Sequence, residues 1–327
     1  MTGFSRVLVA GGAGFIGSHI TDQLLNQDIE VTVLDNLYTG KPENIEQCNG
    51  NRKFRFVQGD VRSFDLVKRL VKNVDAVFNE AAVVSVSRSL EDPILANDVN
   101  VGGTLNLLKA CLDSGVKRFV QASSASVYGN TEILPVLENL APNPVSPYAV
   151  AELVAENYAK VFHFNYGLET VCLRYFNVYG PRQTFSAYSG ATTIFLNKLL
   201  RDQRLIIFGD GNQTRDFVYV EDVVEANMLA LNTEKAAGET FNIANGTPHT
   251  INELVLSIQK QLGKQQLKPI YRSPRQGDIK HSYASIEKAK RIIGYKPKFF
   301  LEKGITKLAK SYQKECMKQS ATHSRAS

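Results

Sequence analysis

Cysteine is scarce in this chain, and its histidines form no metal-binding pattern. The four cysteines lie far apart and form no CxxC pair. The five histidines form neither an HxH nor an HExxH motif. This distribution argues against a disulfide framework and against a zinc site. We therefore expect no metal and a reducing compartment, such as the cytoplasm.

The chain also lacks a long hydrophobic run. No stretch approaches the roughly 20 apolar residues that span a bilayer. Only six residues precede the first apolar run, which starts at Val7, and glycines follow it, so we expect no signal peptide. With 327 residues, 43% hydrophobic and 21% charged, the composition is that of a soluble globular protein. A membrane protein and a disordered chain are excluded.

Basic residues exceed acidic ones, and the formal net charge is +6. The lysines and arginines are spread along the chain, and part of the excess lies in the last eighteen residues. We therefore expect these basic residues to lie on solvent-exposed faces and not to form a nucleic-acid-binding surface. An anionic small ligand would also suit a basic protein. The polar segment 314–327 is expected to be a disordered tail.

Strand and helix patterns alternate over the first half of the chain. The expected strands are 6–10, 30–34, 53–58, 76–79 and 118–122. The segments with helical spacing are 18–27, 64–72 and 101–114. This alternation predicts βαβ units and an α/β fold with a doubly wound parallel sheet.

The alternation ends near residue 176, where polar loops and spaced prolines begin. We expect a nucleotide-binding domain over 1–176 and a smaller α/β region that binds substrate over 177–313. Segments 170–176 and 239–243 are expected to return to the main sheet.

A glycine motif follows the first expected strand. Gly11, Gly14 and Gly17 let the backbone turn tightly and approach a pyrophosphate, while the helix that starts near Phe15 directs free N–H groups at the anion. Asp35 ends the next strand, 18 residues past Gly17, which is the place of a ribose-binding acid. Together these features predict a Rossmann-type domain that binds NAD, because a carboxylate repels the 2′-phosphate of NADP.

Two later segments carry hydroxyl groups suited to catalysis. Serines at 123, 124 and 126 follow the strand at 118–122, and Tyr148 opens the helical stretch at 148–164. A strand-end hydroxyl and a tyrosine on the facing helix can share a proton with one substrate oxygen. Asp60 and Val61 follow the third strand, where either an adenine contact or a plain turn is expected.

The sequence resembles the extended short-chain dehydrogenase/reductase family, and within it the nucleotide-sugar 4-epimerases of the UDP-glucose and UDP-N-acetylglucosamine types. The resemblance covers residues 6–312. The motifs that carry it are GGAGFIGSH at 11–19, DNLYTG at 35–40, NEAAVVSVSRSLEDP at 79–93, ASSASVYG at 122–129, SPYAVAE at 146–152, LRYFNVYGPRQ at 173–183, GDGNQTRDFVYVEDV at 209–223 and RQGDIKHSYASIEKA at 275–289.

The resemblance implies a role for each matched position. It makes Tyr148 the base and Ser124 the catalytic hydroxyl, with Ser123 or Ser126 as an accessory donor. The implied cofactor contacts are Gly11, Gly14, Phe15, Ile16, Gly17, Asp35, Asn36, Asp60, Val61, Ala81, Ala82 and Tyr148. The implied UDP-sugar contacts are Ser85, Ser124, Asn177, Phe208, Arg215, Arg275, Asp278 and Ser282. The implied assembly is a homodimer built on the helices near 101–114 and 148–164.

The implied reaction has no net redox change. The base takes the proton of the sugar 4-hydroxyl while NAD accepts hydride from C4. The 4-keto sugar turns over in the pocket, and the hydride returns to its opposite face.

One position departs from the family pattern YxxxK. Glu152 stands where the lysine lowers the pKa of the catalytic tyrosine, and a carboxylate there should raise it. Three interpretations stay open: a slower enzyme, a protein that binds NAD and nucleotide sugar with little turnover, or a substitution introduced to trap a complex.

Other reactions on this scaffold fit the sequence less well. Related 4,6-dehydratases carry an Asp-Glu pair where Ala125 and Ser126 stand here, and related decarboxylases keep a glutamate at the second position. A 4-reductase would consume NADPH, which Asp35 disfavours. Ser282 replaces a bulky tyrosine found in forms restricted to plain hexoses, and it predicts a pocket that also accepts N-acetylhexosamines.

Overall fold

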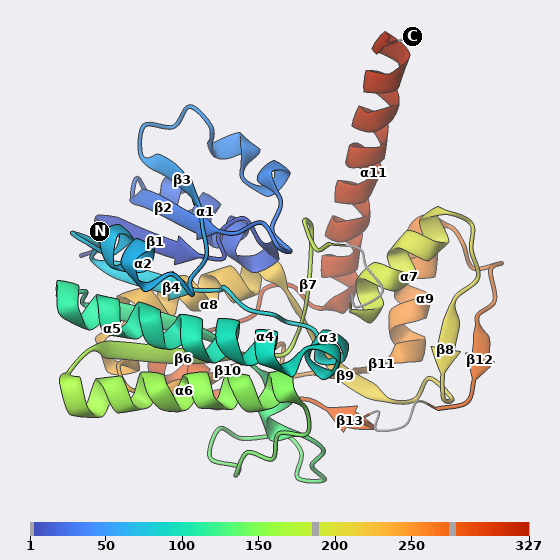
Figure 1. Ribbon diagram of the computed structural model, residues 1–327. Coiled ribbons are helices and arrows are strands. Elements are labelled where there is room, and N and C mark those ends of the chain that lie inside the picture. The colour runs from blue at the N-terminus through green and yellow to red at the C-terminus, as the bar shows by residue number, and fades with distance from the viewer. Residues whose placement is uncertain (1–2, 185–189, 275–278, 327) are drawn as a thin grey trace.

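The computed structural model describes residues 3–184, 190–274 and 279–326, with side chains as far as Gln313. Its main sheet has seven parallel strands in the order β10-β6-β5-β4-β1-β2-β3 (Figure 1). They are β1 (Arg6–Ala10), β2 (Glu30–Asp35), β3 (Phe54–Gln58), β4 (Ala76–Asn79), β5 (Arg118–Ser124), β6 (Glu169–Tyr175) and β10 (Thr240–Ile243). Central strands such as β4 are buried along their whole length, as expected when helices cover both faces.

Helices cover the main sheet on both sides. One layer contains α1 (Phe15–Asn26), α8 (Val220–Asn232) and α10 (Glu287–Ile293). The other contains α2 (Phe64–Leu70), α5 (Thr104–Ser114) and α6 (Pro147–Tyr166). The doubly wound α/β prediction is confirmed. The helix expected over 101–114 begins at Thr104, because a π-helical turn, η3 (Asp98–Gly103), precedes it.

The connection after β4 contains two short helices, α3 (Val86–Glu91) and α4 (Pro93–Asn97). Each has a side-chain cap: the Ser85 hydroxyl accepts from the Arg88 N–H, and the Asp92 carboxylate accepts from the Leu95 N–H. This segment packs against α6, and the Ser89 hydroxyl accepts a hydrogen bond from the Tyr148 N–H at 3.0 Å. The connection thus fixes the first turn of α6.

The second region has two small sheets and its own core. One sheet contains β7 (Asn177–Tyr179), β9 (Thr214–Tyr219), β11 (Pro248–Thr250) and β13 (His281–Ser282), and the other contains β8 (Ile206–Phe208) and β12 (Ile270–Arg272). The helices α7 (Ala191–Leu200), α9 (Ile251–Leu262) and α11 (Leu301–Ala326) pack there through residues such as Leu196, Leu254 and Ile305.

The two regions interleave along the chain. Helices α8 and α10 come from the segment expected to bind substrate, but their side chains, Val223 and Ile293 among them, belong to the core of the main sheet. Strand β10 pairs with β6 at one end of the sheet, where a returning strand was expected. Sequence order alone therefore does not separate the two regions.

The C-terminal segment differs from its prediction. Helix α11 continues to Ala326, whereas residues 314–327 were expected to be a disordered tail. The reason is local, because residues 305–326 contain neither proline nor glycine and include many good helix formers. In Figure 1 this end of α11 extends away from the rest of the chain. No helix of the described residues is long and apolar enough to cross a membrane.

Candidate active site

The glycine turn after β1 leaves room for an anion. Gly11 has a φ of 78°, and a Cβ there would lie 2.6 Å from the Glu80 carbonyl carbon. A Cβ on Gly17 would lie 2.3 Å from the Gly11 carbonyl oxygen. Helix α1 starts after Gly14, which offers no side-chain cap, and its first turn contains no acidic residue. The N–H groups of this turn are therefore available to a pyrophosphate, so the residues fit a dinucleotide.

A cleft at the carboxyl ends of β1, β2 and β4 brings together most of the predicted cofactor contacts. The predicted residues that line it are Gly11, Gly14, Asp35, Asn36, Val61, Ala81 and Ala82. Phe15, Ile16 and Gly17 form the first turn of α1 beside it. This is the edge at which open α/β sheets bind their ligands.

The two predicted acids differ in what they contact. Asp35 is buried, and its two carboxylate oxygens accept from the N–H groups of Ala13 and Leu37. Burial raises the pKa of Asp35, and these hydrogen bonds oppose the rise. Asp60 instead forms a salt bridge with Arg62 at 2.8 Å. The Asp60 carboxylate is thus engaged within its own turn, and Arg62 and Val61 line the cleft.

Tyr148 and Ser124 meet at the end of β5. Ser124 is the last residue of this strand, and Tyr148 lies in the first turn of α6, which begins at the Ser146 cap with Pro147. The Ser124 side chain lies next to the Tyr148 hydroxyl. Burial and the neighbouring Glu152 carboxyl raise the pKa of Tyr148, whereas the Ser124 side chain lowers it.

Ser123 and Ser126, the two candidates for accessory donor, differ in their hydrogen bonds. The Ser123 hydroxyl donates to Glu156 Oε1 at 2.6 Å and is buried. The Ser126 Oγ is buried and has no hydrogen-bond partner among the described residues. A buried hydroxyl without a partner is unfavourable unless a ligand or water completes it. Ser126 is therefore the better candidate for a substrate contact.

Glu152 lies one helical turn after Tyr148 on α6, near enough to raise the pKa of Tyr148. Its side chain is 4% exposed, and its Oε1 accepts from the Asn100 amide at 2.8 Å. Burial raises the pKa of Glu152 to about 8, and the Asn100 hydrogen bond opposes the rise. The next glutamate on the helix, Glu156, is neutralised by two hydrogen bonds from Arg174, each 2.8 Å long. Glu152 has no such partner among the described residues.

The predicted substrate contacts lie mainly in the second region. Asn177 starts β7, and its amide donates to the Asp216 carbonyl at 3.2 Å. Ser282 in β13 is the register partner of Arg215 in β9, so their side chains lie on the same face of that sheet. Phe208 ends β8. Arg275 and Asp278 lie outside the described residues.

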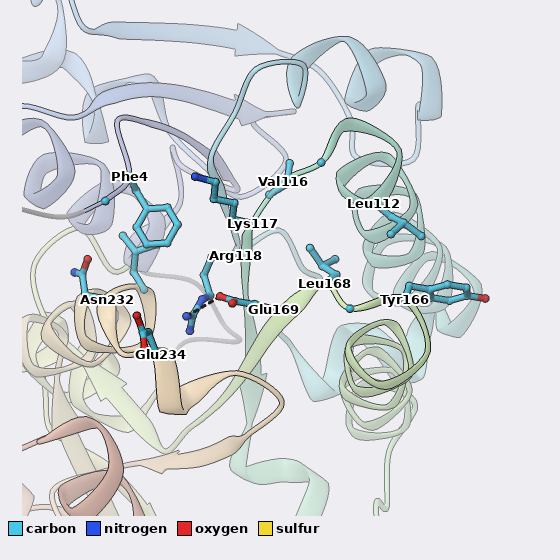
Figure 2. A pocket seen from close by; sticks show the side chains of 14 residues that line it. Phe4, Leu112, Val116, Lys117, Arg118, Tyr166, Leu168, Glu169, Asn232 and Glu234 are labelled. Atoms are coloured by element: carbon cyan, nitrogen blue, oxygen red, sulfur yellow. Dashed lines mark ion pairs between the residues drawn. The ribbon is translucent and has the colours of Figure 1, made fainter.

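A larger cavity of about 880 Å³ lies at the opposite end of the main sheet. Figure 2 shows Arg118 and Glu169 in it, the first residues of β5 and β6. Arg118 Nη2 lies 2.9 Å from Glu169 Oε2. The cavity contains none of the predicted catalytic or cofactor-binding residues, so the cleft at the carboxyl edge is the candidate site.

Comparison with known proteins identifies the family. Residues 7–244 match the model of the NAD dependent epimerase/dehydratase family. The chain belongs to this family. It is 43% identical over 304 residues to a putative UDP-glucose 4-epimerase of Methanocaldococcus jannaschii, covering 92% of this chain and 96% of that relative.

Two solved structures of similar proteins have the same fold. One is a UDP-glucose 4-epimerase of Thermotoga maritima with UDP-glucose, with a TM-score of 0.90, 38% identity, and coverage of 95% of this chain and 99% of that one. The other is a UDP-N-acetylglucosamine 4-epimerase of Methanobrevibacter ruminantium in complex with UDP-N-acetylmuramic acid. Its TM-score is 0.91 at 36% identity, and the coverage is 96% of this chain and 100% of that one.

Two charged residues that line the cleft, Glu80 and Arg62, were not predicted from the sequence. Glu80 lines the cleft between Asn79 and Ala81, and its Oε1 accepts from the Tyr175 hydroxyl at 2.8 Å. Burial raises the pKa of Glu80 to about 8. Arg62 also lines the cleft. The available signal was position alone, because Glu80 directly follows the last residue of β4 and Arg62 lies in the turn after β3.

Proposed function

We propose that this protein is an NAD-dependent 4-epimerase of UDP-hexoses and UDP-N-acetylhexosamines. The observation that carries the proposal is the placement of Tyr148 next to Ser124, beside a glycine cleft that fits a dinucleotide. The relatives named UDP-glucose and UDP-N-acetylglucosamine 4-epimerases support the substrate class. Asp35 in the cleft supports NAD, because its carboxylate disfavours a 2′-phosphate.

The residues suit oxidation and re-reduction at one carbon. NAD, when bound, supplies a hydride acceptor that returns the hydride. Tyr148 accepts the proton of the 4-hydroxyl, and Ser124 holds the same oxygen. Ala125 and Ser126 supply no second acid or base for elimination. Asn177, Arg215, Arg275 and Asp278 are proposed to hold the UDP part, which leaves the hexose free to turn over.

The assay that tests this function is turnover of UDP-galactose and UDP-N-acetylgalactosamine, with the products separated by chromatography. We expect formation of the corresponding 4-epimers without added cofactor. A second candidate function is binding of NAD and nucleotide sugar with little turnover. One observation favours it: the Glu152 carboxyl raises the pKa of Tyr148. Retained NAD and bound UDP-sugar without any product would support that candidate.

Ser282 is proposed to set the size of the sugar pocket. Ser282 pairs with Arg215 in register, so the two side chains share a face of that sheet. We expect Ser282→Tyr to reduce kcat/KM for UDP-N-acetylglucosamine selectively, by about tenfold or more, because an acetamido group would clash with the ring. The kcat/KM for UDP-glucose serves as the reference. An equal loss of kcat/KM on both substrates would contradict a role of Ser282 in setting the pocket size.

We also propose a homodimer in the cytoplasm. Helix α6 exposes apolar side chains on its outer face, Val150, Val161 and Phe164 among them, and Phe164 is 78% exposed. Light scattering at micromolar concentration should give twice the mass of one chain, and a single-chain mass would refute the dimer. The described cysteines, Cys48, Cys111 and Cys172, are free and buried, which suits a reducing compartment.

A further inference from the structure

Two glutamates at the catalytic edge of the sheet are not neutralised by a cation. Glu152 is buried with one amide donor, Asn100, and Glu80 lines the cleft with one hydroxyl donor, Tyr175. Neither takes part in an ion pair of the described residues, whereas Glu156 is bound twice by Arg174. A carboxyl group removed from water without a cation is costly to ionise.

The cations near the two carboxyls are already paired with other acids: Arg62, which lines the cleft, with Asp60, and Arg174 with Glu156. Glu156, on the same helix, and Glu80, after β4, act on Glu152 as like charges. From η3 comes only the neutral amide of Asn100, and from β6 the only cation, Arg174, is held by Glu156. The Glu80 side has Tyr175, whose hydroxyl in turn accepts from the Asn227 amide at 2.8 Å. Neither carboxyl of the pair therefore has a cation of the described residues to neutralise it.

We propose that Glu80 and Glu152 form an acidic pair that balances the positive charge of the oxidised nicotinamide ring and so favours bound NAD⁺ over NADH. The inference rests on the proposed function, which requires a hydride acceptor next to the oxygen held by Tyr148 and Ser124. Glu152 lies one turn after Tyr148, and Glu80 lines the same cleft as the glycine turn. Their carboxyls come from α6 and from the segment after β4, and both are near enough to Tyr148 to raise its pKa.

The pair couples the charge of the ring to a proton. Beside a cationic ring, the pair releases a proton and carries a negative charge. Reduction adds a hydride, that is two electrons and one proton, and makes the ring neutral. The pair then recovers a proton from solvent, so that reduction takes up one proton more than the hydride alone requires. The coupling is strongest near the pKa values of about 8 that burial gives both groups.

The test is the redox equilibrium of the bound cofactor, measured without sugar. The purified holoprotein is equilibrated with a redox dye pair at fixed ratio, and the bound NADH is read from its absorbance. We expect Glu80→Gln and Glu152→Gln each to raise the NADH to NAD⁺ ratio about tenfold at pH 8, equivalent to about 30 mV for a two-electron couple. The effect should shrink at pH 6, where the acids are protonated.

Glu30→Gln is the matched control, because Glu30 is exposed at the opposite end of β2 and should leave the ratio unchanged. A merely structural role for the two acids would weaken both cofactor forms equally and leave the ratio as in the parent. That result would overturn the proposal, as would a change in only one of the two variants.

The same measurement separates this proposal from the proposed function. Failure of the holoprotein to retain any NAD would refute both. Retained NAD with epimerase activity and an unchanged ratio in the glutamine variants would refute only the acidic pair.

Discussion

Tyr148→Phe is expected to lower kcat for epimerisation by a factor on the order of 10² to 10⁴, while the protein still folds and retains its NAD. The Tyr148 hydroxyl lies next to Ser124 at the end of β5, and it is the proposed acceptor of the 4-hydroxyl proton. Phenylalanine keeps the ring and its packing but cannot accept a proton. The measurements are steady-state turnover and the NAD content after denaturation.

Tyr166→Phe is the matched control for this variant. Tyr166 is the last residue of the same helix and is 57% exposed, so removal of its hydroxyl should leave kcat within about twofold of the parent. Normal turnover by Tyr148→Phe would show that another group accepts the proton.

Glu152→Lys should raise kcat about tenfold near neutral pH and shift the pH optimum downward. Burial is the largest cause of the raised pKa of Tyr148, and the Glu152 carboxyl is the next. A lysine replaces this acid by a positive charge near Tyr148, with Glu156 and Glu80 close to it. A decrease of one unit in the pKa of Tyr148 gives about ten times more ionised tyrosine.

The pH profile of kcat distinguishes the possible outcomes of this substitution. Glu152→Gln is the control, since it removes the ionisable acid and adds no charge, and it should give a rate near that of the parent at neutral pH and an intermediate rate above the Glu152 pKa of about 8. A lysine variant no faster than the parent at any pH would mean that Tyr148 is activated by another route. Retained NAD in each variant excludes loss of the fold as the cause.

The main sheet was predictable because most of its strands are buried over nearly their whole length. Strands β1 and β4 have the predicted bounds. A short continuous apolar run between turn residues indicates a buried strand in an α/β pattern. Strand β13 has only two residues, which is too short for any periodicity, and its pairing with β9 depends on distant sequence. For the second region, therefore, the sequence predicted the approximate bounds but not the individual strands or their pairing.

The site was predictable where a motif fixes the backbone. The glycine turn, Asp35 and Tyr148 follow directly from strand and helix ends. The choice between Ser123 and Ser126 depended on which hydroxyl Glu156 binds, and that contact joins residues 33 positions apart. Glu80 was missed because a charged residue after a strand is common, and only the cleft shows its role.

The most direct test of the proposed reaction follows one hydrogen. UDP-glucose and UDP-N-acetylglucosamine that carry deuterium at C4 are incubated with the holoprotein in ordinary water, and the products are analysed by mass spectrometry and NMR. We expect the 4-epimers to form with deuterium still at C4, because the hydride leaves and returns within one catalytic cycle. Products that have lost the deuterium to solvent, or the absence of any 4-epimer, would contradict the proposed reaction.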